Sequence, residues 1–249
     1  MNPCLALGSR SEERYTRLAR YYDALDWPFE FFRYRRIRMQ VVAGLSGCVL
    51  DAGVGTGRNL PYYGPGVSSV TGIDLSDEML VRAQPRVHQA RCKVTLKKMD
   101  VTKLKFPGGY FDAVVSTFLF CVLPDELQVP ALKELIRVTR PGGQIRILEY
   151  QFSRVPWRRR WMELIAPYVE RLYGARFDRR TEEAINESGV YLASERFVHA
   201  DIIRLFELVP YQNQSEVIPR MSPEEARRSQ IGSALSGGRK SPSDLRGQS

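Results

Sequence analysis

The 249-residue sequence predicts an α/β fold, with helices on both faces of a doubly wound, mostly parallel sheet. Two observations lead to this prediction. Strand-like and helix-like segments alternate along most of the chain, as they do when crossover helices join parallel strands. A glycine-rich turn, Gly53 to Gly57, directly follows an apolar run, and doubly wound sheets bind their ligands at such strand ends.

The individual elements follow one another in order. Residues 11–43 predict a helix, because Pro28 is nearly the only breaker among them. The predicted strands are apolar or alternating runs, namely GCVLDAG (47–53), SSVTGIDLS (68–76), KVTLKKMDV (93–101), FDAVVSTFLF (111–120), GQIRILEY (143–150) and DIIRLFELVPY (201–211). The later helices are predicted at PALKELIRVTRPGG (130–143), where Pro-Gly-Gly closes an amphipathic segment, near 157–173, and from about Thr181.

Composition divides the chain into three regions: an N-terminal helical lid (1–43), a ligand-binding α/β domain (44–212) and a disordered tail (213–249). The tail contains eight serines and no aromatic residue, so it has little surface to bury. No apolar run approaches the roughly 20 residues that cross a bilayer, and no signal-peptide pattern is visible. The four cysteines show no spacing typical of metal ligands or disulfides. We therefore expect a cytoplasmic protein without a metal site.

The net charge of +9 is concentrated in two segments. Residues 10–38 carry eight arginines and five acidic residues, and residues 154–180 carry eight arginines and three acidic residues. Localised basic charge indicates an anionic partner surface, either phospholipid or nucleic acid, or else a solvated face without a partner.

The glycine turn is followed by aspartates at two further strand ends. Its G-x-G-x-G spacing, preceded by Asp51, differs from the G-x-G-x-x-G of dinucleotide sites. Asp74 and Asp100 end the next two predicted strands, where one can accept ribose hydroxyls and the other can meet an adenine amino group. Each aspartate alone could be a helix N-cap. Together with the glycines they predict an adenosine site.

At these motifs the sequence resembles the class I S-adenosylmethionine-dependent methyltransferases of the ubiquinone/menaquinone-biosynthesis type. The resemblance covers about residues 15–210. It rests on YYD (21–23), VLDAGVGTGRNLPYY (49–63), GIDLSDEML (72–80), MDV (99–101), FDAVVSTFLFCVLPD (111–125) and LIRVTRPGGQIRILEY (135–150). FDRRT (177–181) is similar to an asparagine-arginine-x-threonine element of bacterial phospholipid N-methyltransferases. The resemblance implies a seven-stranded, Rossmann-like methyltransferase fold with S-adenosylmethionine as cofactor.

The resemblance also implies roles for individual residues. Asp51, Gly53 and Gly55 would line the methionine and ribose, Asp74 the ribose hydroxyls, and Asp100 with Val101 the adenine. Thr117 and Phe118 would face the sulfonium and the acceptor, and Tyr22 would close the lid. The implied cofactor site also includes Leu75 and Met79. A sulfonium donor is already activated, so catalysis mainly requires that the protein align the reacting atoms and exclude water. Tyr22, Glu149, Tyr150 and Asp125 are candidates for a proton acceptor by position only.

The apolar segment STFLFCVLP, after the fourth predicted strand, favours a lipophilic acceptor over nucleic acid. We expect N-methylation of a phospholipid head-group amine, such as that of phosphatidylethanolamine, by a peripheral membrane protein. The alternatives are C- or O-methylation of a quinone precursor, methylation of a small soluble amine or thiol, a nicotinamide-dependent oxidoreductase and a non-catalytic adenosine- or RNA-binding module. The sequence does not predict the oligomeric state.

Two arginine-bordered apolar stripes are the predicted contacts with an anionic membrane. At 100° per residue, one stripe runs along the helix near 157–173. It consists of Trp157, Trp161, Leu164, Ile165, Tyr168 and Leu172. The narrower stripe of the first helix consists of Trp27, Tyr34, Ile37 and Val41. Aromatic residues bordered by arginines are typical of helices that lie in a membrane interface. The alternative is that both stripes pack on the sheet.

Overall fold

The computed structural model describes residues 34–210. The chain divides into two compact units, residues 1–212 and 213–249, and every described residue belongs to the first. Most of the predicted lid, including Tyr22 and Trp27, lies outside the described residues, as does the whole predicted tail.

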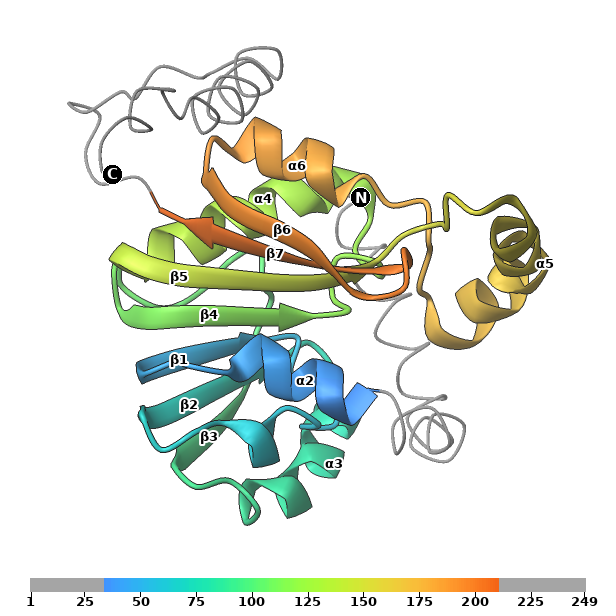
Figure 1. Ribbon diagram of the computed structural model, residues 1–249. Helices are drawn as coiled ribbons and strands as arrows, with labels where there is room; N and C mark the ends of the chain where they lie inside the picture. The colour runs from blue at the N-terminus through green and yellow to red at the C-terminus, as the bar shows by residue number, and fades with distance from the viewer. Residues whose placement is uncertain (1–33, 211–249) are drawn as a thin grey trace, which may run out of the picture. The chain divides into compact units, whose positions relative to one another are not determined.

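The described residues form a seven-stranded sheet in the order β3-β2-β1-β4-β5-β7-β6 (Figure 1). Its strands are β1 (Gly47–Ala52), β2 (Val67–Asp74), β3 (Lys93–Lys98), β4 (Phe111–Thr117), β5 (Thr139–Tyr150), β6 (Tyr191–His199) and β7 (Ile203–Val209). The first five are parallel to one another, and β7 is antiparallel to both β5 and β6. The prediction of a doubly wound, mostly parallel sheet is confirmed.

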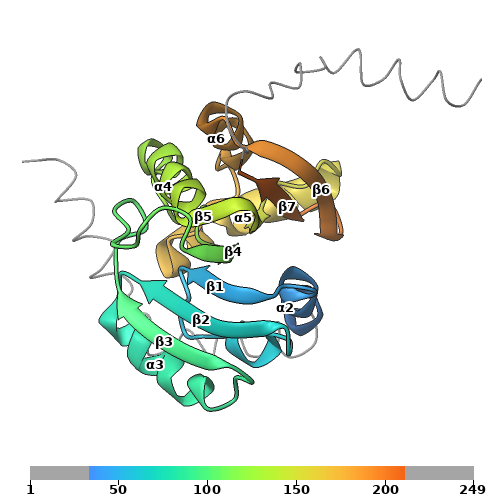
Figure 2. The same ribbon diagram turned by 90° about the vertical axis from the view of Figure 1, so that its left-hand side faces the viewer.

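Helices cover both faces of this sheet (Figure 2). The helices of the described residues are α2 (Arg35–Val42), the short 3₁₀ helix η2 (Leu60–Tyr62), α3 (Asp77–Val87), α4 (Asp125–Val138), α5 (Pro156–Tyr173) and α6 (Thr181–Ser188). Of these, α5 adds no residue to the core on either face. On one face, α4 and α6 pack on a core that includes Leu50, Val114 and Ile147. On the other, α2, η2 and α3 pack on a second core that includes Val49 and Val115. Adjacent residues of one strand thus enter opposite cores, as the alternation of side chains in a strand requires.

The strand order reverses between β1 and β4, which are neighbours with β2 on one side and β5 on the other. In a doubly wound sheet, ligands bind at the carboxyl ends of the strands where the order reverses. The glycine turn follows β1 and the apolar segment follows β4, so both predicted binding segments lie at this point.

Two details of the predicted elements were wrong. Pro-Gly-Gly (141–143) does not close a helix, since α4 ends at Val138 and the tripeptide lies inside β5. The register with β4 shifts there, from Phe111 opposite Thr139 to Ala113 opposite Gln144, and such an irregularity accommodates proline in a strand. The edge strand β6 was not located in the sequence, because its polar and charged residues leave it half exposed.

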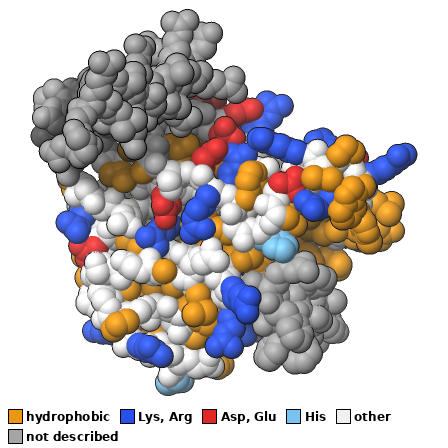
Figure 3. Space-filling model, in the orientation of Figure 1, with side chains coloured by type: hydrophobic (Ala, Val, Ile, Leu, Met, Phe, Trp, Pro, Cys, Tyr) orange, Lys and Arg blue, Asp and Glu red, His pale blue; other side chains and the backbone are white. Residues whose placement is uncertain are grey.

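The two predicted membrane-facing stripes differ in their exposure to solvent. In α2, Ile37 and Val41 are 3% and 0% exposed and pack in the core, so the prediction that these two residues face a membrane was wrong. In α5 the apolar stripe does not pack on the sheet. Five of its six side chains are exposed by 39 to 69%, namely Trp157, Trp161, Leu164, Tyr168 and Leu172, and Ile165 is half-buried. Figure 3 shows this hydrophobic surface with basic side chains around it.

Candidate active site at the strand ends

The glycine turn needs its glycines for conformation and for packing. Gly53, Gly55 and Gly57 have φ values of 72°, 53° and 81°, in the left-handed region that only glycine adopts readily. A Cβ on Gly53 would lie 3.0 Å from the Leu119 side chain, and one on Gly57 would lie 3.0 Å from the Cβ of Ala83. At Gly55 the nearest atom to such a Cβ is a carbonyl oxygen at 4.0 Å. The backbone at Gly55 therefore remains open to a ligand.

Asp74 holds the turn in place from the end of β2. Its Oδ2 accepts a hydrogen bond of 2.9 Å from the Gly55 N–H, and its Oδ1 accepts one of 2.9 Å from the Ser76 N–H. Burial raises the pKa of the Asp74 carboxyl above its usual value. A carboxylate can accept about four hydrogen bonds, so the two oxygens keep capacity for hydroxyl groups of a ligand.

A buried polar network fills the space below the glycine turn. Asp51 is fully buried and accepts hydrogen bonds from Tyr63 Oη (2.9 Å) and from Asn59 Nδ2 (3.2 Å to each oxygen). Burial raises the pKa of Asp51 to about 6, against the opposing effect of these hydrogen bonds. Asn59 Nδ2 also lies 3.1 Å from Thr117 Oγ1, which joins the end of β1 to the end of β4.

Arg38 is a site residue that the sequence analysis missed. Although it belongs to the first arginine-rich segment, it is only 8% exposed, and its Nη1 donates to Asn59 Oδ1 at 2.9 Å. Its guanidinium also lies 5.8 Å from the centre of the Phe118 ring. A signal was present in the sequence, because Arg38 lies one helical turn from Tyr34 and from Val42, on the face of α2 that is buried. The placement brings a cation beside the glycine turn.

The residues predicted to meet adenine, Asp100 and Val101, and the two further cofactor-site residues, Leu75 and Met79, are divided between surface and interior. Asp100 is exposed, and its Oδ1 accepts hydrogen bonds of 2.8 Å from both the N–H and the hydroxyl of Thr102. Leu75 is 37% exposed, whereas Val101 and Met79 are 7% and 3% exposed. Leu75 and Asp100 can therefore contact a ligand at the ends of β2 and β3, while Met79 packs below them.

Aromatic rings gather where β4 and β5 end. The Phe118 ring stacks on the Tyr150 ring with centroids 4.4 Å apart, and the Tyr34 ring meets Phe118 edge-on at 5.7 Å. Phe177 packs edge-on against Tyr150 at 5.6 Å. Phe118 itself has a φ of 57°, which is rare for a residue with a large side chain. We call these four residues the aromatic wall.

Glu149, predicted as a candidate proton acceptor, binds backbone. Its Oε1 accepts from the Phe120 N–H at 2.7 Å and its Oε2 from the Cys121 N–H at 3.0 Å. Burial raises the pKa of this carboxyl to about 7. The Tyr150 hydroxyl lies 2.6 Å from the Tyr34 hydroxyl. Tyr22, the third candidate, lies outside the described residues. Asp125, at the start of α4, pairs with Arg179 at 3.0 Å.

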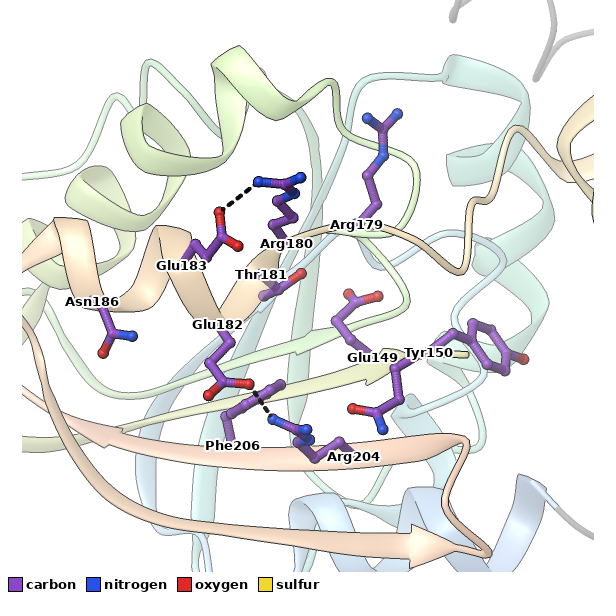
Figure 4. Close-up of a pocket in the computed structure, with 11 residues that line it drawn as sticks. Glu149, Tyr150, Arg179, Arg180, Thr181, Glu182, Glu183, Asn186, Arg204 and Phe206 are labelled. Carbon is purple, nitrogen blue, oxygen red and sulfur yellow. Dashed lines mark hydrogen bonds and ion pairs between the residues drawn. The ribbon is translucent and has the colours of Figure 1, made fainter. Parts of the chain in front are cut away.

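A cavity of about 340 Å³ adjoins the aromatic wall between β5, β7 and α6 (Figure 4). Its lining includes Glu149 and Tyr150 from β5, Arg179 and Thr181 near the start of α6, and Arg204 from β7. Within residues 34–210, no group of three or more metal-ligating side chains is found.

The sheet order is that of a Rossmann-like fold, and the chain is similar in fold to S-adenosylmethionine-dependent methyltransferases. Residues 49–143 match the family described as "Methyltransferase domain". A solved S-adenosylmethionine-dependent methyltransferase from Thermotoga maritima superposes with a TM-score of 0.62 at 19% identity, over 80% of this chain and 99% of that one. The predicted resemblance and fold are confirmed.

Two curated relatives differ in the acceptor that their names give. A phosphatidylethanolamine N-methyltransferase from Cereibacter sphaeroides is 42% identical over 48% of this chain and 58% of the relative. A ubiquinone/menaquinone biosynthesis C-methyltransferase from Bdellovibrio bacteriovorus is 36% identical over 43% of this chain and 46% of the relative. The chain thus matches about half the length of each. None of the helices within residues 34–210 is long and apolar enough to span a membrane.

Proposed function

We propose that this protein transfers a methyl group from S-adenosylmethionine to a lipophilic acceptor, the head-group amine of a phospholipid such as phosphatidylethanolamine, at an anionic membrane surface. The observation that carries the proposal is the exposed aromatic stripe of α5, which follows β5 closely in the chain and so lies near the candidate site. The 42% identity to a phosphatidylethanolamine N-methyltransferase supports the same acceptor.

The strand ends fit the donor. Asp74 would accept the ribose hydroxyls beside the open backbone of Gly55, and Leu75 with Asp100 would border the adenine. Asp51, Gly53 and Thr117 would line the methionine portion. Arg38, a buried cation that donates to Asn59, would face the carboxylate of the donor, since a guanidinium binds carboxylates well.

The donor supplies a methyl group on a sulfonium, a leaving group that needs no further activation. The chain therefore has to orient the acceptor, exclude water and provide for the proton of the attacking amine. Phe118 and Tyr150 would hold cationic groups against their rings, an interaction of about 0.5 to 2 kcal/mol. We assign Tyr150 as the candidate for the proton transfer, because its hydroxyl can take a proton from the amine while its own proton passes to the Tyr34 hydroxyl, 2.6 Å away. Glu149 is a positioning residue for the segment after β4, since both of its oxygens bind that backbone.

The α5 stripe would rest on the membrane interface. Its exposed aromatic residues suit the head-group region, and the exposed Arg160 and Arg171 border it. The helix is held by Asp201, whose carboxylate accepts from Ser153 Oγ (2.8 and 2.9 Å) and pairs with Arg158. Docking through a fixed helix would bring a lipid head group to the site without moving the acyl chains into water.

A quinone precursor is the second candidate acceptor, because one curated relative is a quinone-biosynthesis C-methyltransferase. Incubation with methyl-labelled S-adenosylmethionine and a total lipid extract separates the two. We expect label in methylated derivatives of phosphatidylethanolamine. Label confined to a quinone would replace the phospholipid by the second candidate, and an unlabelled lipid extract would contradict both.

A further inference from the structure

Asn59 connects a buried cation to a buried anion below the glycine turn. Its Oδ1 accepts a hydrogen bond of 2.9 Å from Arg38 Nη1, and its Nδ2 lies 3.2 Å from each carboxylate oxygen of Asp51. Arg38, Asn59 and Asp51 are 8%, 2% and 0% exposed. An amide side chain carries its acceptor at one end and its donors at the other. The two charges therefore fix the orientation of the Asn59 amide.

The position of Asn59 in the chain would suit a different role. Asn59 directly precedes the 3₁₀ helix η2, and asparagine is one of the residues preferred at such an N-cap. Its side chain nevertheless makes no capping hydrogen bond. The amide is directed into the buried network instead of to the helix that it precedes. Stabilisation of η2 therefore does not explain the presence of an asparagine here.

Thr117 receives hydrogen bonds from two members of this network. Asn59 Nδ2 donates to Thr117 Oγ1 at 3.1 Å, and Arg38 Nη1 donates to the same oxygen at 3.4 Å. A hydroxyl accepts through its lone pairs and donates through one proton, so the Thr117 proton is directed to another group. Arg38 and Thr117 each remain 8% exposed. A guanidinium beside a hydroxyl donor is suited to a carboxylate.

The Asn59 amide also bridges two charges that attract each other. Burial raises the pKa of Asp51 to about 6, while the hydrogen bonds of Tyr63 and Asn59 and the positive charge of Arg38 oppose this rise. The charge of Arg38 thus acts on Asp51. Without the amide between them, the guanidinium would turn toward Asp51, because unpaired buried charges are costly.

We propose that Asn59 is a positioning residue, which holds Arg38 and Thr117 in place for the carboxylate of the donor and so makes the site selective for donors that carry this group. The inference rests on the proposed function, in which Arg38 faces the donor carboxylate. Asn59 acts through these two residues and does not itself contact the donor. Arg38 supplies the charge, and Asn59 fixes the direction in which that charge points.

Variants of Asn59 and Arg38 in the full-length protein test the inference. Asn59→Leu has nearly the shape of the parent residue but neither donates nor accepts a hydrogen bond, and Asn59→Ala is a second, smaller variant that cannot clash. Arg38→Met removes the cation and keeps an unbranched apolar side chain. The matched control is Tyr63→Phe, because the Tyr63 hydroxyl donates to Asp51 in the same network and not to Arg38.

The readout is the preference for a carboxylate, measured by calorimetry as the ratio of the affinities for S-adenosylhomocysteine and for its decarboxylated analogue. Both ligands share the adenosine, the thioether and the amine, so damage to the fold of the site weakens both alike. Circular dichroism and retained affinity for the analogue establish that each variant is folded.

A charge-assisted hydrogen bond predicts that the parent prefers S-adenosylhomocysteine by about 10- to 100-fold. We expect Arg38→Met to abolish this preference and Tyr63→Phe to keep it. Both Asn59 variants should reduce it by roughly 5- to 10-fold, because the guanidinium remains but is no longer held toward the carboxylate. Asn59→Leu should change nothing further in the Arg38→Met protein, since Asn59 acts through Arg38.

The outcomes separate this inference from the proposed function. If Arg38→Met abolishes the preference but the Asn59 variants keep it, the carboxylate lies at Arg38 and the role of Asn59 is refuted. If the Asn59 variants weaken both ligands equally, Asn59 supports only the fold of the site and the inference is again wrong. If Arg38→Met keeps the preference, the inference and the proposed placement of the donor fail together. Lipid methylation does not enter these measurements, so failure of the proposed acceptor leaves the inference standing.

Discussion

The hydroxyl of Tyr34 lies 2.6 Å from the hydroxyl of Tyr150, and this hydrogen bond joins helix α2 to the end of β5. The two rings also contact Phe118, one edge-on and one stacked. The aromatic wall thus depends on the packing of α2, the helix that also brings Arg38 beside the glycine turn.

The first prediction concerns this hydroxyl pair. Tyr34→Phe and Tyr150→Phe should each lower the free energy of unfolding by about 1 kcal/mol, because each leaves a part-buried hydroxyl without this partner. The double variant should lose less than the sum, with a coupling of about 0.5 to 1.5 kcal/mol. Urea denaturation of the four proteins measures the coupling, and strictly additive losses would show that the hydrogen bond does not stabilise the fold.

The second prediction concerns the donor. Asp74→Ala should weaken binding of S-adenosylmethionine by about 2 to 3 kcal/mol, roughly 30- to 150-fold, because ribose hydroxyls lose their acceptor and Gly55 loses its anchor. Asp77→Ala is the control, since the Asp77 side chain is 65% exposed and pairs with Lys98. Calorimetry should show parent-like affinity for the control. Equal affinities for all three proteins would remove Asp74 from the donor site.

The third prediction is a pH dependence of stability. The pKa of Glu149 is raised to about 7 from 4.5, so the folded state retains a proton that the unfolded state releases. Glu149 therefore stabilises the fold fully below its unfolded pKa, and this stabilisation is lost as the pH rises toward 7. Asp51, with a pKa raised to about 6 from 3.8, acts in the same direction at lower pH.

Glu149→Gln isolates the upper part of this dependence. Denaturation from pH 4 to 8 should show the parent losing stability as the pH rises, by roughly 2 to 4 kcal/mol from Glu149 alone. The variant should be less stable overall, because the Phe120 and Cys121 N–H groups donate to different oxygens and one of them would face the amide NH2 group. It should nevertheless lack the loss between about pH 5 and 7. If the stability of Glu149→Gln falls between about pH 5 and 7 as steeply as that of the parent, Glu149 is not the group that causes the loss.

The fourth prediction is that α5 docks on anionic membranes. Trp161→Ser should weaken co-sedimentation with anionic vesicles, because the Trp161 side chain is 57% exposed in the apolar stripe. The double variant of Arg160 and Arg171 to alanine should weaken it by about 2 kcal/mol, near 30-fold, at low salt only. Arg159→Ala is the control, since Arg159 pairs with Glu163 away from the stripe. If vesicle binding is the same with and without anionic lipid, and is not weakened by the Trp161 variant or the double arginine variant, α5 is excluded as the docking surface.

Local patterns account for what the sequence predicted well. The apolar runs of β1, β2 and β4 and the three spaced glycines are short-range signals, because buried parallel strands and left-handed turns each demand particular residue types. Helical periodicity predicted the apolar stripe of α5. It did not predict that the stripe is exposed, because the same periodicity is found in a helix that packs on a sheet.

Long-range contacts account for what the sequence did not predict. In the sequence, Glu149 is a candidate base at the end of a strand. Its hydrogen bonds to the Phe120 and Cys121 N–H groups depend on the path of the chain after β4, which the sequence does not show. In the sequence, Arg38 is one of several closely spaced arginines that could all be solvated. Its burial results from the packing of α2 on the sheet. The pairing of Arg179 with Asp125 likewise joins segments that are far apart in sequence.

The central claim, methyl transfer to a phospholipid amine, is tested most directly by mass spectrometry of defined vesicles after incubation with S-adenosylmethionine. One set of vesicles contains phosphatidylethanolamine in an anionic lipid background, and a matched set contains phosphatidylcholine instead, whose amine is already fully methylated. The account predicts methylated phosphatidylethanolamine and an equal amount of S-adenosylhomocysteine from the first set, and neither from the second. Unmodified phosphatidylethanolamine in the presence of protein that binds both the donor and the vesicles would contradict it.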